Sequence, residues 1–163
     1  LWRVMVSADK SQLVECWRRE LEQRLRSLDS NQSAARAGTR VDGSHRPENR
    51  GERAAVTTQG YLAHGLQQRM DSLGEQLRLV KEMGCDAREE VVVGAWLELE
   101  LESGECREVA IFPGGDATCI QLDGRSVQIL SPSSPLVQPL LGLEEGDGAE
   151  LKVLGSVELR RIR

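Results

Sequence analysis

The sequence is poor in aromatic residues, which make up 3% of its 163 positions, and it contains no long apolar run. Its aromatic residues are Trp2, Trp17, Tyr61, Trp96 and Phe112. So few aromatics nearly exclude a stacking platform for single-stranded nucleic acid. No stretch approaches the roughly 20 apolar residues that a membrane-spanning helix needs. The sequence therefore predicts no association with a membrane and a core built from aliphatic side chains.

The common catalytic and metal-binding motifs are also absent. The sequence contains no P-loop, no G-x-G-x-x-G, no G-x-S-x-G and no H-E-x-x-H pattern. The four cysteines form no C-x-x-C pair and fit no zinc spacing. Residues 1–11 lack the sustained apolar region of a signal peptide. We therefore expect a cytoplasmic protein whose thiols are reduced and packed as small apolar side chains.

Charge is distributed unevenly along the chain. Residues 1–90 carry 15 Lys/Arg and 14 Asp/Glu, a net charge of +1, whereas residues 91–163 carry 6 and 12, a net charge of −6. A DNA-binding domain normally has a basic surplus on its binding face. The acidic C-terminal part therefore argues against direct sequence-specific DNA binding and favours a basic protein surface as its partner.

Apolar periodicity predicts two helices in the first half of the chain. Residues 7–37 contain no Pro or Gly, and one helical face carries Leu13, Trp17, Leu21, Leu25 and Leu28. A polar, Gly-rich segment follows at residues 38–51. A second stripe then has near-heptad spacing and comprises Leu62, Leu66, Met70, Leu73, Leu77 and Val80. The prediction is an antiparallel coiled-coil hairpin over residues 7–84 with its tip at 38–51.

From about residue 91 the apolar period changes from 3.6 to 2. Leu97, Leu99 and Leu101 alternate with glutamates, which predicts a half-buried strand. Further strands are expected at residues 107–112, 118–122, 126–130, 150–154 and 156–162, with a hairpin turn at Asp123-Gly124 and one short helix at 136–141. The predicted fold class is α+β, with the hairpin followed by a small antiparallel β domain at residues 91–163.

The hairpin tip is the first candidate functional segment, with Asp42, His45, Glu48, Asn49 and Glu52. As a purely structural feature it is a solvated loop in which Glu48 and Asn49 stabilise the start of the second helix. As a functional feature it is a long arm that carries carboxylates to a metal ion in the active site of another protein.

The second candidate is the loop that contains Ser133, Ser134 and Pro135. Its structural interpretation is a turn in which Ser134 caps a short helix whose first residue is Pro135. Its functional interpretation is an exposed edge that docks on a partner, and the two interpretations are compatible.

Three motifs, taken in their order along the chain, resemble those of a known family. Ser134-Pro135 opens the pattern S-P-x-x-x-x-L-x-G-x-x-x-G-D, which ends at Gly146-Asp147. Glu48-Asn49 is followed, after spacers, by Ala54-Ala55 and Gln59-Gly60-Tyr61, and the β domain opens with Val93-Gly94-Ala95. Over about residues 10–163, the chain resembles the bacterial Gre transcript-cleavage factors (GreA and GreB).

The resemblance implies a fold, a partner and roles for the candidate residues. The β domain would be FKBP-like and would dock on the rim of the RNA polymerase secondary channel through Ser133, Ser134 and Pro135. The hairpin would enter the channel, where Asp42, Glu48 and Asn49 at its tip would help position a shared Mg²⁺ and a water. The protein would bind core RNA polymerase as a monomer, hold no stable metal or cofactor alone, and not itself be an enzyme.

The tip departs from the family pattern D-x-x-E-N, because its first acid falls on His45 and only Glu48 keeps its register. A histidine and Arg46 beside a cation oppose its binding by charge. A channel-binding regulator without cleavage activity is therefore an alternative to a cleavage factor. From other classes, the alternatives are an FKBP-type prolyl isomerase or binding module and a coiled-coil scaffold. In the short helix, Pro139 replaces the family's alanine, and we expect a shortened helix.

Overall fold

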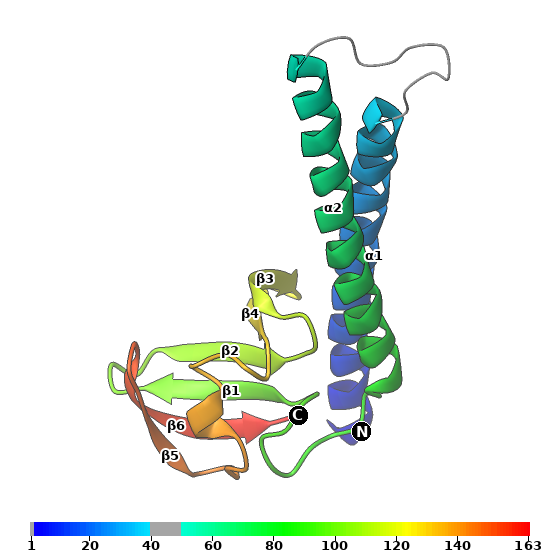
Figure 1. Cartoon of the computed structure of the whole chain (residues 1–163). Helices are drawn as coiled ribbons and strands as arrows, with labels where there is room; N and C mark the ends of the chain where they lie inside the picture. The colour runs from blue at the N-terminus through cyan, green and yellow to red at the C-terminus, as the bar shows by residue number, and fades with distance from the viewer. Residues whose placement is uncertain (1, 40–49) are drawn as a thin grey trace. The chain divides into compact units, whose positions relative to one another are not determined.

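The chain folds into two long helices followed by one six-stranded sheet (Figure 1). The computed structural model describes the backbone of residues 2–39 and 50–163, and the side chains of residues 10–34, 36–37 and 50–163. The elements are α1 (Trp2–Thr39), α2 (Arg50–Glu82), β1 (Trp96–Leu101), β2 (Cys106–Ile111), β3 (Asp116–Leu122), β4 (Arg125–Leu130), the 3-10 helix η1 (Gln138–Leu140), β5 (Gly148–Leu151) and β6 (Gly155–Ile162). The predicted α+β class is confirmed.

Internal contacts divide the chain into two compact units, which are described separately. The hairpin unit is Glu20–Gln76, and the sheet unit combines Leu1–Arg19 with Leu77–Arg163. Within the described residues, neither α1 nor α2 has an apolar stretch long enough to cross a bilayer.

The hairpin unit holds two antiparallel helical segments whose facing sides follow a regular seam (Figure 1). In α1, Leu21 is buried and Leu25 and Leu28 are half-buried, as predicted. Residues of α2 with partly buried side chains recur at alternating steps of 3 and 4, and they are Val56, Gln59, Ala63, Leu66, Met70 and Leu73. The Nε2 of Gln32, which is also buried, donates a hydrogen bond to Oε1 of Gln67 at 2.5 Å. The helical hairpin is therefore confirmed.

One residue of the predicted α2 stripe was wrong. Leu62 is 55% exposed, and its neighbour Ala63 lies in the seam instead. The alternation of 3 and 4 continues upstream from Leu66 to Ala63, whereas successive steps of 4 drift around the helix away from the partner. The position of the repeat, and not the size of the side chain, decided which residue faces α1.

The strands of the sheet unit lie in the order β3-β4-β2-β1-β6-β5. Every neighbouring pair is antiparallel except β2 and β4, which run parallel from Glu108↔Val127 to Ile111↔Leu130. The predicted antiparallel β domain is therefore confirmed, with one parallel pairing that the sequence did not predict. After β2 the chain passes to the outer edge as β3, and the hairpin back from β3 gives β4 the same direction as β2.

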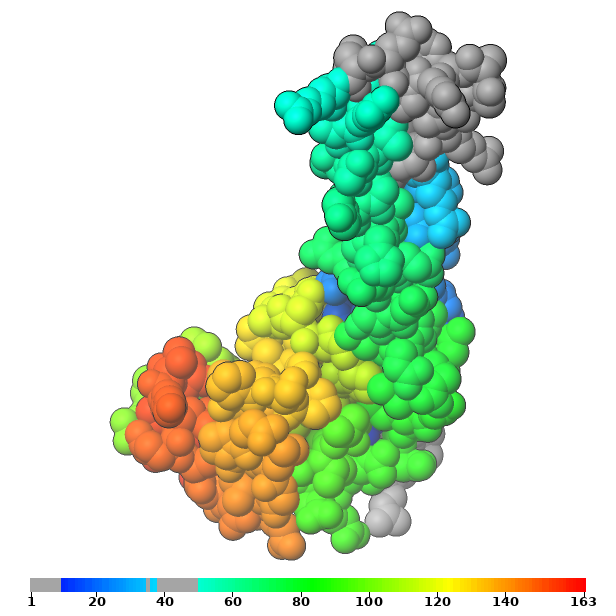
Figure 2. Space-filling model, viewed as in Figure 1, coloured from blue at the N-terminus to red at the C-terminus, as the bar shows by residue number. Residues whose placement is uncertain are grey.

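One face of the sheet packs into the main apolar core. Leu97 and Leu99 of β1 point into it together with Val109 of β2 and Leu159 of β6. Val137 and Leu140, from the segment around η1, complete this core, and Figure 2 shows that segment in orange at the surface of the unit. The alternation predicted for residues 97–101 is confirmed.

The first part of α1 is fastened to the sheet unit by hydrogen bonds to backbone carbonyls. Trp17 is fully buried, and its Nε1 donates to the Pro113 carbonyl at 2.9 Å. Lys10 is also buried, and its Nζ donates to the carbonyls of Asp86 and Arg163. Burial and the nearby Arg88 guanidinium lower the pKa of Lys10 from 10.5 to about 8.

Candidate protein-docking site

The structure brings together one of the two predicted sets of functional residues. Ser133, Ser134 and Pro135 lie in the connection between β4 and η1, where Ser133 and Pro135 are exposed and Ser134 is half-buried. The tip residues Asp42, His45, Glu48 and Asn49 lie outside the described residues. Their proposed role stays a prediction.

Hydrogen bonds fix the first half of this loop. The hydroxyl groups of Ser131 and Ser133 lie 2.7 Å apart, and the Ser133 N–H donates to the Ser131 hydroxyl at 3.1 Å. The Ser134 N–H donates to the Ser131 carbonyl at 3.0 Å. A loop held in this way loses little further conformational freedom when a partner binds it.

Ser134 begins the second half of the loop, but the prediction that it caps the short helix was wrong, because η1 begins at Gln138 and its N-cap residue is Val137, without a side-chain cap hydrogen bond. The Ser134 carbonyl accepts from the N–H groups of Val137 and Gln138 at 2.9 and 3.0 Å. Its hydroxyl accepts from the Leu136 N–H at 3.4 Å, a long hydrogen bond. The Gln138 side chain donates back to the Pro132 carbonyl at 2.8 Å and closes the loop.

The segment beneath the loop is anchored in the core. Val137 and Leu140 are fully buried, so the exposed Ser133 and Pro135 stand on a packed base. The regular helix is only the 3-10 turn Gln138–Leu140, with Pro139 at its start, and not the predicted 136–141. The helix is short, as expected, and Pro139 lies in its first turn, where the missing N–H costs no helical hydrogen bond.

The G-x-x-x-G-D end of the motif is explained by the backbone. Gly142 and Gly146 have φ of 80° and 91°, a region that favours glycine. Their N–H groups donate to the carbonyls of Val91 at 2.9 Å and Leu159 at 2.7 Å. The Asp147 carboxylate accepts from the Glu144 N–H at 2.8 Å. This part of the motif therefore builds the fold, and the Ser-Pro part offers the exposed surface.

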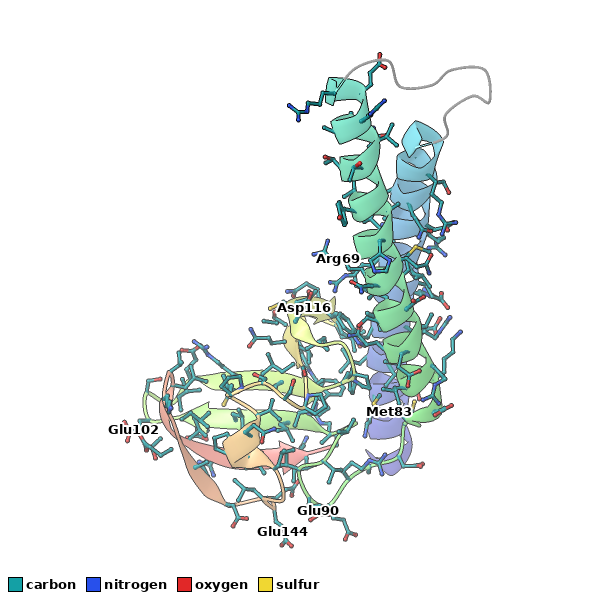
Figure 3. All side chains as sticks on the ribbon, in the orientation of Figure 1. Arg69, Met83, Glu90, Glu102, Asp116 and Glu144 are labelled. Atoms are coloured by element: carbon teal, nitrogen blue, oxygen red, sulfur yellow. The ribbon has the colours of Figure 1, made fainter. Side chains whose placement is uncertain are left out.

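Acidic side chains surround the connection from η1 to β5. Glu90 and Glu144 are joined by an isolated antiparallel bridge, and Figure 3 shows both at one edge of the sheet unit with their side chains pointing outward. Glu145 of this connection and Glu150 of β5 are exposed as well. A basic protein surface is the chemical complement of such an edge.

One residue with a defined role was missed by sequence reasoning. The Oε1 of Glu145 accepts a hydrogen bond from the Ile162 N–H at 2.7 Å, next to the irregular pairing of β1 with β6. Nothing in the sequence distinguishes Glu145 from the other loop glutamates, because its partner is a backbone group on another strand. Among the described residues, no three His, Cys, Asp or Glu side chains are grouped to hold a metal ion.

Comparisons with known proteins found similarity to solved structures alone. No protein-family model matches the chain, and no curated protein matches it. The chain is similar to the GreA factor homolog 1 (Gfh1) of Thermus thermophilus, with 19% identity, a TM-score of 0.35, and coverage of 90% of this chain and 94% of that one. A second structure, described as the transcription factor Gfh1, gives 21% identity, a TM-score of 0.37 and coverage of 90% and 92%.

Proposed function

We propose that this protein is a Gre-type transcription elongation factor that binds core RNA polymerase at its secondary channel. The observation that carries the proposal is the rigid, exposed loop formed by Ser133, Ser134 and Pro135. It lies in a sheet domain that follows a long helical hairpin, and the motif that forms it is the one through which the sequence resembles the Gre family.

Each part of the molecule has a distinct role in this proposal. The loop docks on the rim of the channel, while the hairpin unit enters the channel and carries the tip toward the polymerase active site. Glu48, with Asp42 and Asn49, approaches a metal ion that the polymerase holds. The bond cleavage is performed by the polymerase, so the protein does no chemistry of its own.

Two outputs are compatible with this placement, and the tip residues separate them. We propose stimulation of transcript cleavage first, with Glu48 as the carboxylate that keeps the family register, and a non-cleaving regulator second. In a stalled, backtracked complex, Glu48→Ala should lower the cleavage rate about 10–100-fold. His45→Asp restores the family spacing and should increase it. Wild type that binds polymerase without accelerating cleavage would leave the regulator alone.

Docking is tested by the affinity for core polymerase. Replacing Ser134 and Pro135 together by alanine should raise the Kd about tenfold or more, equivalent to about 1.4 kcal/mol, because the Ser134 hydroxyl and the fixed φ of Pro135 are both lost. Ser103→Ala, in the exposed β1–β2 turn, is the matched control and should bind like wild type. Urea unfolding of wild type and both variants checks the fold, because a cooperative transition in each shows that the fold is retained. Unchanged binding of the double variant would refute the docking role.

The prolyl isomerase alternative gains no support from the sheet unit. An isomerase pocket needs accessible aromatic side chains, but Trp96 and Phe112 are 1% and 0% exposed. The Trp96 ring lies under the Arg163 guanidinium, 4.7 Å from its centroid, and its Nε1 donates to Glu108 at 2.8 Å. Both aromatics of the β domain therefore serve its interior.

A further inference from the structure

The half of α2 nearest residue 50 has a second apolar face in addition to its seam with α1. Tyr61 is 76% exposed and Leu62 is 55% exposed, the largest apolar exposures in the hairpin unit among the described residues. At helical spacings from these two lie other exposed small side chains. Together they form the Tyr61 face, defined as Ala54, Ala55, Thr58, Tyr61, Leu62 and Gly65.

Hydrogen bonding makes this face more apolar than its sequence suggests. The Thr58 hydroxyl donates to the Ala54 carbonyl at 2.9 Å, and the neighbouring Thr57 hydroxyl donates to the Arg53 carbonyl at 2.9 Å. Each hydroxyl is thereby turned to the helix backbone, which leaves its methyl group to face outward. The solvent-facing side of a two-helix coil is normally charged, so an uncharged side calls for a further reason.

Packing inside the hairpin unit does not explain the glycines of this stretch of α2. A Cβ added at Gly60 or Gly65 would meet nothing within 4 Å, so neither glycine makes room for a neighbouring side chain. Each costs about 1 kcal/mol of helix stability relative to alanine. Gly65 belongs to the Tyr61 face, one turn after Tyr61, and leaves a flat surface there that is open to close approach by another polypeptide. Figure 2 shows this stretch of α2, in teal to green, as outer surface.

Charge indicates what kind of partner fits. From Arg53 to Met70, α2 contains no Asp or Glu, although the whole chain has a net charge of −5. Arg53 and Arg69 flank the Tyr61 face, are exposed, and make no side-chain hydrogen bond or ion pair with the described residues. Figure 3 labels Arg69 on α2. Unpaired guanidinium groups at the border of an apolar face are complementary to carboxylates.

We propose that the Tyr61 face is a contact surface for a protein partner that presents an apolar depression bordered by acidic side chains. Tyr61 and Leu62 enter the depression, Gly65 lets the partner backbone approach, and Arg53 and Arg69 pair with the border. The inference rests on the proposed function, under which the partner is the wall of the polymerase secondary channel.

The test measures the Kd of full-length protein for core RNA polymerase. The double variant Tyr61→Ser/Leu62→Ser should bind at least about tenfold more weakly, because aromatic anchors dominate interface energies. Arg69→Gln should weaken binding by a smaller factor, about 2–5-fold, as expected for an ion pair at an interface rim. The matched control is Val153→Ser, which removes an apolar side chain that is 86% exposed in the sheet unit, and it should bind like wild type.

The outcomes separate this inference from the proposed function. If wild type binds polymerase and the double variant binds as tightly, the Tyr61 face is refuted and the proposed function stands. If wild type does not bind polymerase, both fall. Loss of RNA or DNA oligonucleotide binding in the double variant, with unchanged polymerase affinity, would assign the face to nucleic acid. If wild type is a dimer in sedimentation equilibrium and the double variant is a monomer, the Tyr61 face binds a second copy of the chain. Either of these two results overturns the proposal.

Discussion

The two units of this protein use unusual residues for opposite purposes. In the sheet unit, Gly142 and Gly146 adopt positive φ, and a Cβ at Gly115 would lie 2.2 Å from the Leu130 carbonyl carbon. In the hairpin unit, a Cβ added at Gly60 would meet no atom within 4 Å, and the Tyr61 side chain is 76% exposed. A residue that is unusual for its position is explained by folding when it makes close contacts inside its own unit. An unusual residue without such contacts is explained instead by binding to a partner.

The strongest test of this contrast compares two aromatic residues. Trp17 is fully buried in the sheet unit, so Trp17→Ala should lower the free energy of unfolding by about 3–5 kcal/mol. Tyr61→Ala should change it by less than about 0.5 kcal/mol, because an exposed side chain loses little packing. Urea denaturation followed by circular dichroism measures both. A costly Tyr61→Ala would show that the exposed ring stabilises the fold and would break the contrast.

Gly115→Ala should also destabilise the sheet unit, by about 3 kcal/mol, because the new methyl group would collide with the backbone after Leu130. The Leu130 carbonyl carbon, 2.2 Å from the added Cβ, belongs to the backbone, so it cannot move away by a change of side-chain rotamer. Thermal unfolding monitored in the near ultraviolet is the readout. An unchanged melting temperature would mean that the turn before β3 shifts freely.

Lys10 predicts a pH dependence that belongs to the sheet unit. Its pKa is lowered to about 8 in the folded protein from an ordinary 10.5. Between those values the unfolded chain binds more protons, so the contribution of Lys10 to stability rises as pH rises from about 8 to 10.5, on the order of 3 kcal/mol. Below about pH 8 both states are protonated and the slope from this group vanishes.

The control is Lys10→Met, because methionine cannot titrate. Urea midpoints measured from pH 7 to pH 10 should rise more steeply for wild type than for the variant, whatever the absolute cost of leaving two carbonyls without a donor. Parallel curves would show that Lys10 keeps an ordinary pKa in the folded protein.

The smallest expected effect is a gain. Gly65→Ala should stabilise the hairpin unit by about 0.5–1 kcal/mol, because the methyl group has open space and alanine favours the helix. Thermal unfolding measures the gain, and polymerase affinity should fall because the flat surface beside Tyr61 is lost. A variant that is both more stable and fully active in binding would leave Gly65 without a role.

Local patterns predicted the elements well, and long-range geometry limited the rest. The period-2 alternation of Leu97, Leu99 and Leu101 and the Asp123-Gly124 turn fixed strands within a few residues. The parallel pairing of β2 with β4 was not predicted, since no local pattern encodes which strand lies at the edge. The FKBP-like assignment stays a prediction.

The candidate site followed the same rule. The turn at Ser134 and Pro135 was predicted, because a Ser-Pro turn is local chemistry, whereas the helix cap assigned to Ser134 was wrong. Sequence reasoning did not predict the contact from Glu145 to Ile162 or the burial of Lys10, because each depends on groups far away in the sequence. The outward Leu62 was misassigned because adjacent Leu62 and Ala63 both fit an approximate heptad, and only packing chooses between them.

The hydrogen bonds of Lys10 have a consequence for synthesis on the ribosome. Lys10 lies in α1, yet one of its two acceptors is the carbonyl of Arg163, a separation of 153 residues. Translation adds about 5–20 residues per second, so this amine waits on the order of ten seconds for its second partner. During that interval α1 can pair with α2, whose residues follow directly, and shelter its apolar stripe.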